Sequence, residues 1–301
     1  MSSAAVQAVD RLFPYEWWQS QLPVLVRRYR NNAPCPHILL KDFLPQDVAL
    51  EMAEEFPRAS TNAWTQYKHA NENKQGMSKR QLFPPMLRAV TEELNSPQFV
   101  RWVSKLTGVV DLVADPVLDG GGLHQSGRDG YLNLHTDFSV HHFHRNWRRR
   151  VNLIIYLNPG WRGEWGGAIE LWERSSSGKN SSGKDSDGKI TRCAAKYPPL
   201  LNHALIFTTD ERSLHGFPEP LTCPSGASRK SLALYYYTIE RGKKANSRST
   251  DYFARPEDGW GKSATIWLDK KALHWYSRAK TRFGFSDEVA SRVLGFISRK
   301  K

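Results

Sequence analysis

Cysteine is scarce in this chain, and long apolar runs are missing from it. The 301 residues include three cysteines, Cys35, Cys193 and Cys223, which lie far apart. Because an odd and small number of cysteines gives no disulfide framework, we expect a reducing compartment. No stretch approaches the roughly 18 consecutive apolar residues that suggest a membrane-spanning helix, and the N-terminus lacks the basic-then-apolar layout of a secretory signal. The sequence therefore favours a cytoplasmic protein without a membrane partner.

Acidic residues are also few relative to basic ones. The chain has 43 Lys and Arg against 30 Asp and Glu, a net charge of +13. Such a balance is compatible with a nucleic-acid or protein substrate and with an acidic small molecule. The basic residues are spread along the chain, which is more typical of a solvated surface than of a nucleic-acid-binding stripe. A composition that is 40% hydrophobic and 12% aromatic indicates a globular chain with a substantial core.

The segment Tyr131–Asp137, YLNLHTD, is the most informative about chemistry. In a strand its residues alternate between two faces, so Asn133, His135 and Asp137 share one face. His215, in the later segment SLHG, offers a second imidazole. Two histidines and one carboxylate form a facial triad, which leaves positions on iron(II) open for a cosubstrate and dioxygen. We therefore predict that His135, Asp137 and His215 bind a metal and form the catalytic centre.

Strand-like segments surround the predicted ligands. They are VNLIIYLN (Val151–Asn158), AIELW (Ala168–Trp172), HALIF (His203–Phe207) and LALYYYT (Leu232–Thr238). From Pro36 to Thr238, this order of strands and ligands resembles the iron(II)/2-oxoglutarate-dependent dioxygenase superfamily, specifically its prolyl-4-hydroxylase-like branch. The resemblance implies an α+β fold with a double-stranded β-helix core, a jelly roll of the cupin type, buttressed by N-terminal helices.

The resemblance, together with a change of pattern after Thr238, predicts three regions. Residues 1–110 would form a helical and edge-strand support, residues 111–240 the double-stranded β-helix core, and residues 241–301 a C-terminal helical annex. Residues 174–189 contain no apolar side chain, so we predict an exposed insertion there. Residues 58–80 are polar and irregular, which indicates a loop near the pocket.

Two further local predictions concern proline and turn residues. The helical spacing of Tyr15–Tyr29 is interrupted by Pro23, where we expect a helix to start or kink. Residues 240–261 are rich in turn formers, and helices are expected to follow at 264–284 and 286–300.

The resemblance also implies a cosubstrate. Enzymes of this kind oxidise 2-oxoglutarate with O2 to succinate and CO2 while they hydroxylate a substrate, and ascorbate is a candidate reductant. Arg229 stands at the start of the penultimate core strand, where relatives carry the basic residue that binds the distal carboxylate of 2-oxoglutarate. Ser231 and Tyr156 match hydroxyl groups beside that carboxylate. Lys230 is the other candidate for binding this carboxylate, but its side chain should face the opposite side of the strand from Arg229.

The sequence constrains the substrate less. Phe138, Trp172 and Tyr235 are predicted to line the substrate wall, and His141 to reach the substrate. The favoured function is hydroxylation of an unactivated C–H bond of a small amino-acid-like or metabolite substrate. Alternatives within the superfamily are a prolyl or ribosomal protein hydroxylase and a nucleic-acid or protein N-demethylase. A non-catalytic jelly-roll binding module is a further alternative, against which the complete set of ligands argues. The sequence does not indicate an oligomeric state.

Overall fold

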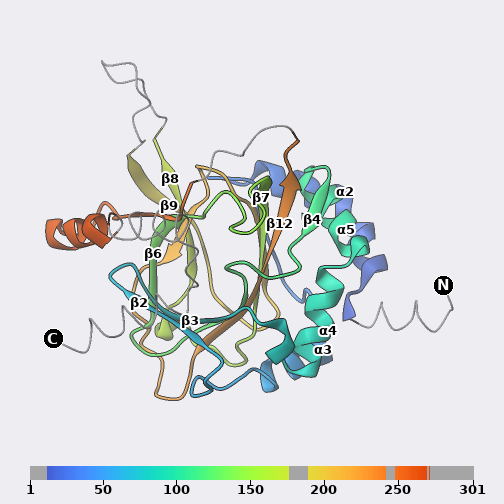
Figure 1. Ribbon diagram of the computed structural model, residues 1–301, viewed down its shortest axis with the longest axis horizontal. Coiled ribbons are helices and arrows are strands. Elements are labelled where there is room, and N and C mark those ends of the chain that lie inside the picture. The colour runs from blue at the N-terminus through green and yellow to red at the C-terminus, as the bar shows by residue number, and fades with distance from the viewer. Residues whose placement is uncertain (1–11, 176–188, 242–247, 270, 272–301) are drawn as a thin grey trace.

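The computed structural model describes residues 12–175, 189–241, 248–269 and 271. In this part of the chain, antiparallel strands form one sheet of 13 strands that curls into a near-closed barrel. Four helices from the first part of the chain gather on one side of the barrel (Figure 1). They are α2 (Tyr15–Asn31), α3 (Gln46–Glu54), α4 (Pro85–Leu94) and α5 (Pro97–Thr107).

The strands follow one another through most of the chain. They are β1 (His37–Leu40), β2 (Thr65–His69), β3 (Glu72–Met77), β4 (Leu112–Ala114), β5 (Gly122–Ser126), β6 (Tyr131–Thr136), β7 (Trp147–Tyr156), β8 (Ile169–Arg174), β9 (Ile190–Tyr197), β10 (Ala204–Thr208), β11 (Leu214–Phe217), β12 (Arg229–Ile239) and β13 (Asp251–Phe253).

Two half-sheets make the barrel, and β3 joins them. The spatial order is β1-β10-β7-β12-β5-β3-β6-β11-β8-β9, with β2 on β3, β4 on β12 and β13 on β6. On one side of β3, Gln75 lies opposite Gln125 of β5. On the other side, Glu72 lies opposite Leu132 of β6. The interior of the barrel therefore has walls from segments far apart in the sequence.

The helices cover the outer face of the larger half-sheet because that face is apolar. Leu153 and Ile155 of β7 are completely buried and belong to the same cluster as the helices. At its centre, the ring of Phe99 on α5 lies 4.9 Å from Phe13 and 6.2 Å from Tyr236 of β12. Each such side chain contributes about 1.5–3 kcal/mol when it leaves water, so this layer fixes β12 and β7 firmly. The barrel interior is thereby free to carry polar groups.

The helix boundaries of α5 follow from local chemistry. The hydroxyl of Ser96 accepts a hydrogen bond from the backbone N–H of Phe99 at 3.2 Å and caps the first turn. Gly108 ends the helix with a φ of 76°, a conformation that glycine adopts without a steric penalty.

Some sequence predictions need correction. Residues 58–80 are not an irregular loop, because they contain the hairpin β2–β3. Helix α2 runs through Pro23 and begins at Tyr15. In the turn-rich segment, residues 251–253 form β13, which pairs with the ligand-bearing strand β6.

Other predictions fall partly outside the described residues. The centre of the predicted insertion, residues 176–188, lies outside the described residues. Residues 272–301, which hold most of the two helices predicted at the C-terminal end, also lie outside them. Residues 260–269 are helical. The division of the chain at residues 110 and 240 stays a prediction. Within the described ranges, no helix is both long enough and apolar enough to cross a membrane.

Candidate active site

His135, Asp137 and His215 converge inside the barrel. His135 on β6 lies directly opposite His215 on β11, and Asp137 follows β6. Nε2 of His135 is 3.8 Å from Oδ1 of Asp137, and Nε2 of His215 is 3.7 Å from Oδ2. One donor atom from each residue lies within 4.8 Å of the others. Two imidazole nitrogens and a carboxylate at this spacing fit the donor set of an iron(II) facial triad.

Backbone carbonyls orient both imidazoles. Nδ1 of His135 is 3.0 Å from the carbonyl oxygen of Asn133, and Nδ1 of His215 is 2.8 Å from that of Ser213. A carbonyl only accepts, so each Nδ1 carries the proton and each Nε2 presents its lone pair to the triad centre. Burial, aided by the neighbouring His215, lowers the pKa of His135 to about 3. Burial also lowers the pKa of His215, so both rings are neutral, as metal ligands must be.

Asp137 is held in its ionised form by two donors. The Asn152 side-chain amide donates to Oδ2 of Asp137 at 2.8 Å, and Arg149 forms an ion pair with the same oxygen at 3.2 Å. Although burial opposes ionisation, the Arg149 guanidinium keeps the pKa of Asp137 well below its usual range. The guanidinium itself stacks 3.3 Å from the ring centroid of Tyr235 and 4.6 Å from that of Phe138. The carboxylate therefore has a fixed position and charge.

Arg229, at the start of β12, is a buried cation. Its Nε donates to the carbonyl of Gly167 at 2.7 Å, and its Nη2 donates to the hydroxyl of Tyr156 at 3.3 Å. In the described part of the chain, no carboxylate forms an ion pair with Arg229, and burial lowers its pKa. A buried charge without a counterion is costly. The arrangement fits a site that is completed by an anionic ligand.

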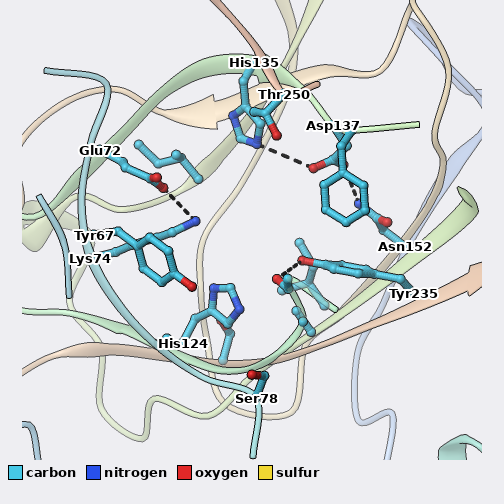
Figure 2. Close-up of a pocket in the computed structure, with 18 of the residues that line it drawn as sticks. Tyr67, Glu72, Lys74, Ser78, His124, His135, Asp137, Asn152, Tyr235 and Thr250 are labelled. Atoms are coloured by element: carbon cyan, nitrogen blue, oxygen red, sulfur yellow. Dashed lines mark hydrogen bonds and ion pairs between the residues drawn. The ribbon is translucent and has the colours of Figure 1, made fainter. Parts of the chain in front are cut away.

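The triad and Arg229 line the same cavity, which has a volume of about 610 Å³. This volume lies within the roughly 300–1,000 Å³ of small-molecule sites. Figure 2 shows side chains from opposite walls that point into it. Other residues that line it are Tyr67, Glu72, Lys74, His124, Phe138, Tyr235 and Tyr252.

The structure separates the predicted substrate residues into two groups. Phe138 and Tyr235 line the cavity. His141 does not: its ring is completely buried, with Nε2 3.3 Å from a carboxylate oxygen of Asp115. Trp172 packs in a separate apolar cluster and is also absent from the lining. The prediction that His141 and Trp172 contact substrate is therefore wrong, because both side chains are used in packing.

The predicted cosubstrate residues lie together. Ser231 lines the cavity two residues after Arg229 on β12. Tyr156 is completely buried, and its hydroxyl accepts a hydrogen bond from Arg229, which does line the cavity. The Lys230 ammonium lies 5.5 Å from the ring of Phe56, outside the cavity, as strand alternation predicts.

Sequence reasoning missed the contribution of β3. Glu72 and Lys74 lie two residues apart on this strand, and both line the cavity. Their alternation within ENKQGM was the available signal. It was obscured because no apolar residues alternate with them.

Comparison with known proteins adds the family. Residues 121–237 match the family described as "2OG-Fe(II) oxygenase superfamily". No curated protein sequence matches this chain significantly.

Several solved structures are similar to this chain at low sequence identity. One is a prolyl hydroxylase from Trichoplax adhaerens, in complex with a hypoxia inducible factor peptide fragment, at 16% identity, covering 79% of this chain and 94% of that chain with a TM-score of 0.47. A prolyl-4-hydroxylase from Pseudomonas putida is 14% identical to this chain. The match covers 73% of this chain and 100% of the hydroxylase, with a TM-score of 0.45. HygX from Streptomyces hygroscopicus is 12% identical to this chain. The match covers 73% of this chain and 87% of HygX, with a TM-score of 0.41. Likeness at this level does not identify a substrate.

The family match runs from the start of β5 into β12. It therefore contains the three converging ligands and Arg229. Residues 121–237 of this chain therefore match the 2OG-Fe(II) oxygenase superfamily, and this matched part holds His135, Asp137 and His215 as a facial triad.

Proposed function

We propose that this protein hydroxylates an unactivated C–H bond of a small amino-acid-like or metabolite substrate. One oxygen atom of O2 would enter the substrate as a hydroxyl group, and the other would enter succinate as 2-oxoglutarate loses CO2. The observation that carries the proposal is the buried Arg229, which has no carboxylate partner in the described residues and lines the cavity that holds the triad.

Arg229 would bind the distal carboxylate of 2-oxoglutarate. A guanidinium offers two parallel N–H donors to a carboxylate. The bond from Arg229 to Gly167 restrains the fork, and Tyr156 and Ser231 place hydroxyl groups beside it. The cosubstrate would then lie in the cavity that Arg229 shares with the triad.

The triad residues would hold the metal. His135 and His215 supply neutral Nε2 atoms, and Asp137 supplies a carboxylate oxygen. Arg149 and Asn152 keep that carboxylate ionised and oriented. Iron(II) and 2-oxoglutarate, when bound, supply the oxidising chemistry.

Phe138 and Tyr235 would form part of the wall around the substrate. Both side chains line the cavity with Asp137, and the Arg149 guanidinium stacks on both rings. The limited cavity volume favours a small molecule over a folded protein domain or duplex nucleic acid. A flexible peptide segment is the alternative that the test below includes.

The test has two stages. Anaerobic addition of iron(II) and then 2-oxoglutarate should produce the weak visible charge-transfer band of the chelate, and His215→Ala should not. Succinate release, with ascorbate as reductant, is then measured with panels of small metabolites, proline-containing peptides and methylated nucleic acids. Stimulation by small metabolites alone supports the proposal. Selective stimulation by peptides or by methylated nucleic acid would replace it with the corresponding alternative.

A further inference from the structure

One more charged pair lines the cavity, and the triad does not use it. Nζ of Lys74 is 2.8 Å from Oε2 of Glu72, and the two side chains are 18% and 9% exposed. Figure 2 shows this pair on one wall, with the Lys74 nitrogen directed toward the centre of the pocket. His135 and Asp137 lie on other sides of the same pocket.

The pair is held in place by His69, which also lines the cavity. Oε1 of Glu72 is 2.9 Å from Nε2 of His69, whose Nδ1 is 2.8 Å from a carboxylate oxygen of Asp269. Burial opposes ionisation of Glu72, but Lys74 and His69 together keep its pKa below the usual range. Glu72 in turn raises the pKa of Lys74 against the effect of burial. The cavity wall therefore presents a fixed ammonium beside a fixed carboxylate.

The Lys74 ammonium has capacity for a ligand. It carries three N–H donors, and among the described residues Glu72 is the carboxylate that pairs with it. The ring of Tyr67 lies 5.5 Å from Nζ, on the cavity side. Donors that point into a cavity can make charge-assisted hydrogen bonds with an anion.

Two other cations that line the cavity, Arg149 and Arg229, have separate roles. Arg149 pairs with Asp137, and Arg229 is assigned to the distal carboxylate of the cosubstrate. Lys74 lies on β3, in a different part of the barrel wall from both. Glu72, Lys74 and the three triad residues nevertheless line one and the same cavity. A substrate in this cavity can therefore contact the pair while it lies near the metal site.

We propose that Lys74 and Glu72 bind the carboxylate and the ammonium of a free amino acid, which is the substrate class of this oxygenase. A cation and an anion side by side complement a zwitterion. From this headgroup site, the amino-acid side chain would extend toward the triad along Phe138 and Tyr235. The inference rests on the proposed function, because it assumes that Arg229 is occupied by 2-oxoglutarate.

The test compares two pools of compounds on the full chain loaded with iron(II) and 2-oxoglutarate. One pool contains free L-amino acids, and the other contains the matching amino-acid amides, which keep the ammonium and lose the carboxylate. We expect the first pool to stimulate succinate release on the order of a hundredfold more than the second, as for a lost hydrogen-bonded charge pair. Binding is read independently from the thermal shift that each pool causes.

Three variants sharpen the comparison. Lys74→Met should abolish the preference for amino acids over amides, whereas Lys74→Arg should retain part of it. Lys230→Met removes a lysine outside the cavity and should behave as the unmodified protein. The 2-oxoglutarate titration should be unchanged in all three, which shows that each variant is folded and binds its cosubstrate.

The outcomes separate the inference from the proposed function. A missing chelate band in the unmodified protein overturns the proposed function. A normal chelate band, with equal stimulation by both pools or by neither, overturns the amino-acid assignment alone. Weakened 2-oxoglutarate binding in Lys74→Met, with the preference intact, would reassign Lys74 to the cosubstrate.

Discussion

At the scale of the residue, Arg229 is the side chain whose burial most needs a ligand. Arg229→Ala should weaken 2-oxoglutarate binding by about 2–5 kcal/mol, the usual cost of truncating a buried charge pair. The anaerobic chelate titration measures this directly. The affinity of Arg229→Lys for 2-oxoglutarate should lie between those of the unmodified protein and Arg229→Ala. Lysine keeps the positive charge but cannot form the bidentate hydrogen bonds of a guanidinium. An unchanged titration in Arg229→Ala would contradict the assignment.

Asp137 supports a second residue-level prediction. Asp137→Ala should abolish iron binding and turnover, because it removes the anionic ligand of the triad. It also leaves the buried Arg149 without its carboxylate, so folding must be checked by circular dichroism. Asp119→Asn is the matched control: Asp119 also lines the cavity but pairs with His142. Equal iron loss in both variants would show that the effect is not specific to the ligand.

The residues that could be predicted from the sequence were those with a distinctive spacing. His135 and Asp137 stood out through strand alternation, and His215 through the strand order that the superfamily shares. Glu72 and Lys74 could not be recognised, because only the fold places β3 between β5 and β6. His141 was misassigned because proximity in sequence to the ligand pair does not determine which way a loop side chain points.

At the scale of the element, the hairpin β2–β3 shows why polar strands are missed. Strand recognition depends on apolar residues at every second position. In β3, the residues that would carry that signal instead face a polar cavity, as Glu72 and Lys74 do. The apolar strands β7, β10 and β12 were recognised because they pack against the helices. β13 escaped prediction because it has only three residues, Asp251–Phe253.

The turn of this hairpin is attached to the helical residues 260–269 in a pH-dependent way. His69 contacts Glu72 and Asp269 through its two nitrogens, and the ring of Tyr252 lies 6.0 Å away. Burial alone would lower the pKa of His69, but hydrogen bonds to Asp269 and Glu72 raise this pKa from 6.5 to about 9. The protonated form is therefore the one that stabilises the folded protein.

We expect His69→Gln to lose this stabilisation. The difference in unfolding free energy from the unmodified protein should be largest below pH 6.5 and should disappear as the pH rises through about 9. At roughly 1.4 kcal/mol per unit of pKa shift, the change is about 3 kcal/mol. Urea denaturation at a series of pH values measures it. A difference that grows with pH would have the wrong sign for this explanation.

At the scale of the whole molecule, the barrel brings together residues that no local pattern connects. The triad comes from β6, the residue that follows it, and β11, while the cosubstrate arginine comes from β12 and the charged pair from β3. The resemblance to the superfamily predicted the triad and the role of Arg229, and all of these residues lie within the matched residues 121–237. β3 and β13 lie outside that range, and their contribution to the cavity follows only from strand pairing.

Because the ligands bridge distant strands, their binding should stabilise the whole barrel. A ligand at a hundred times its dissociation constant adds about 2.7 kcal/mol to the free energy of unfolding, if it binds only the folded state. For a chain of this length, that corresponds to a rise in Tm of about 4 °C. Thermal unfolding with iron(II) and 2-oxoglutarate under anaerobic conditions should show this rise, and a chelator should reverse it. In Asp137→Ala the metal should give no rise, and in Arg229→Ala the metal should still act while 2-oxoglutarate adds little. Equal shifts in all three proteins would mean that the ligands bind elsewhere.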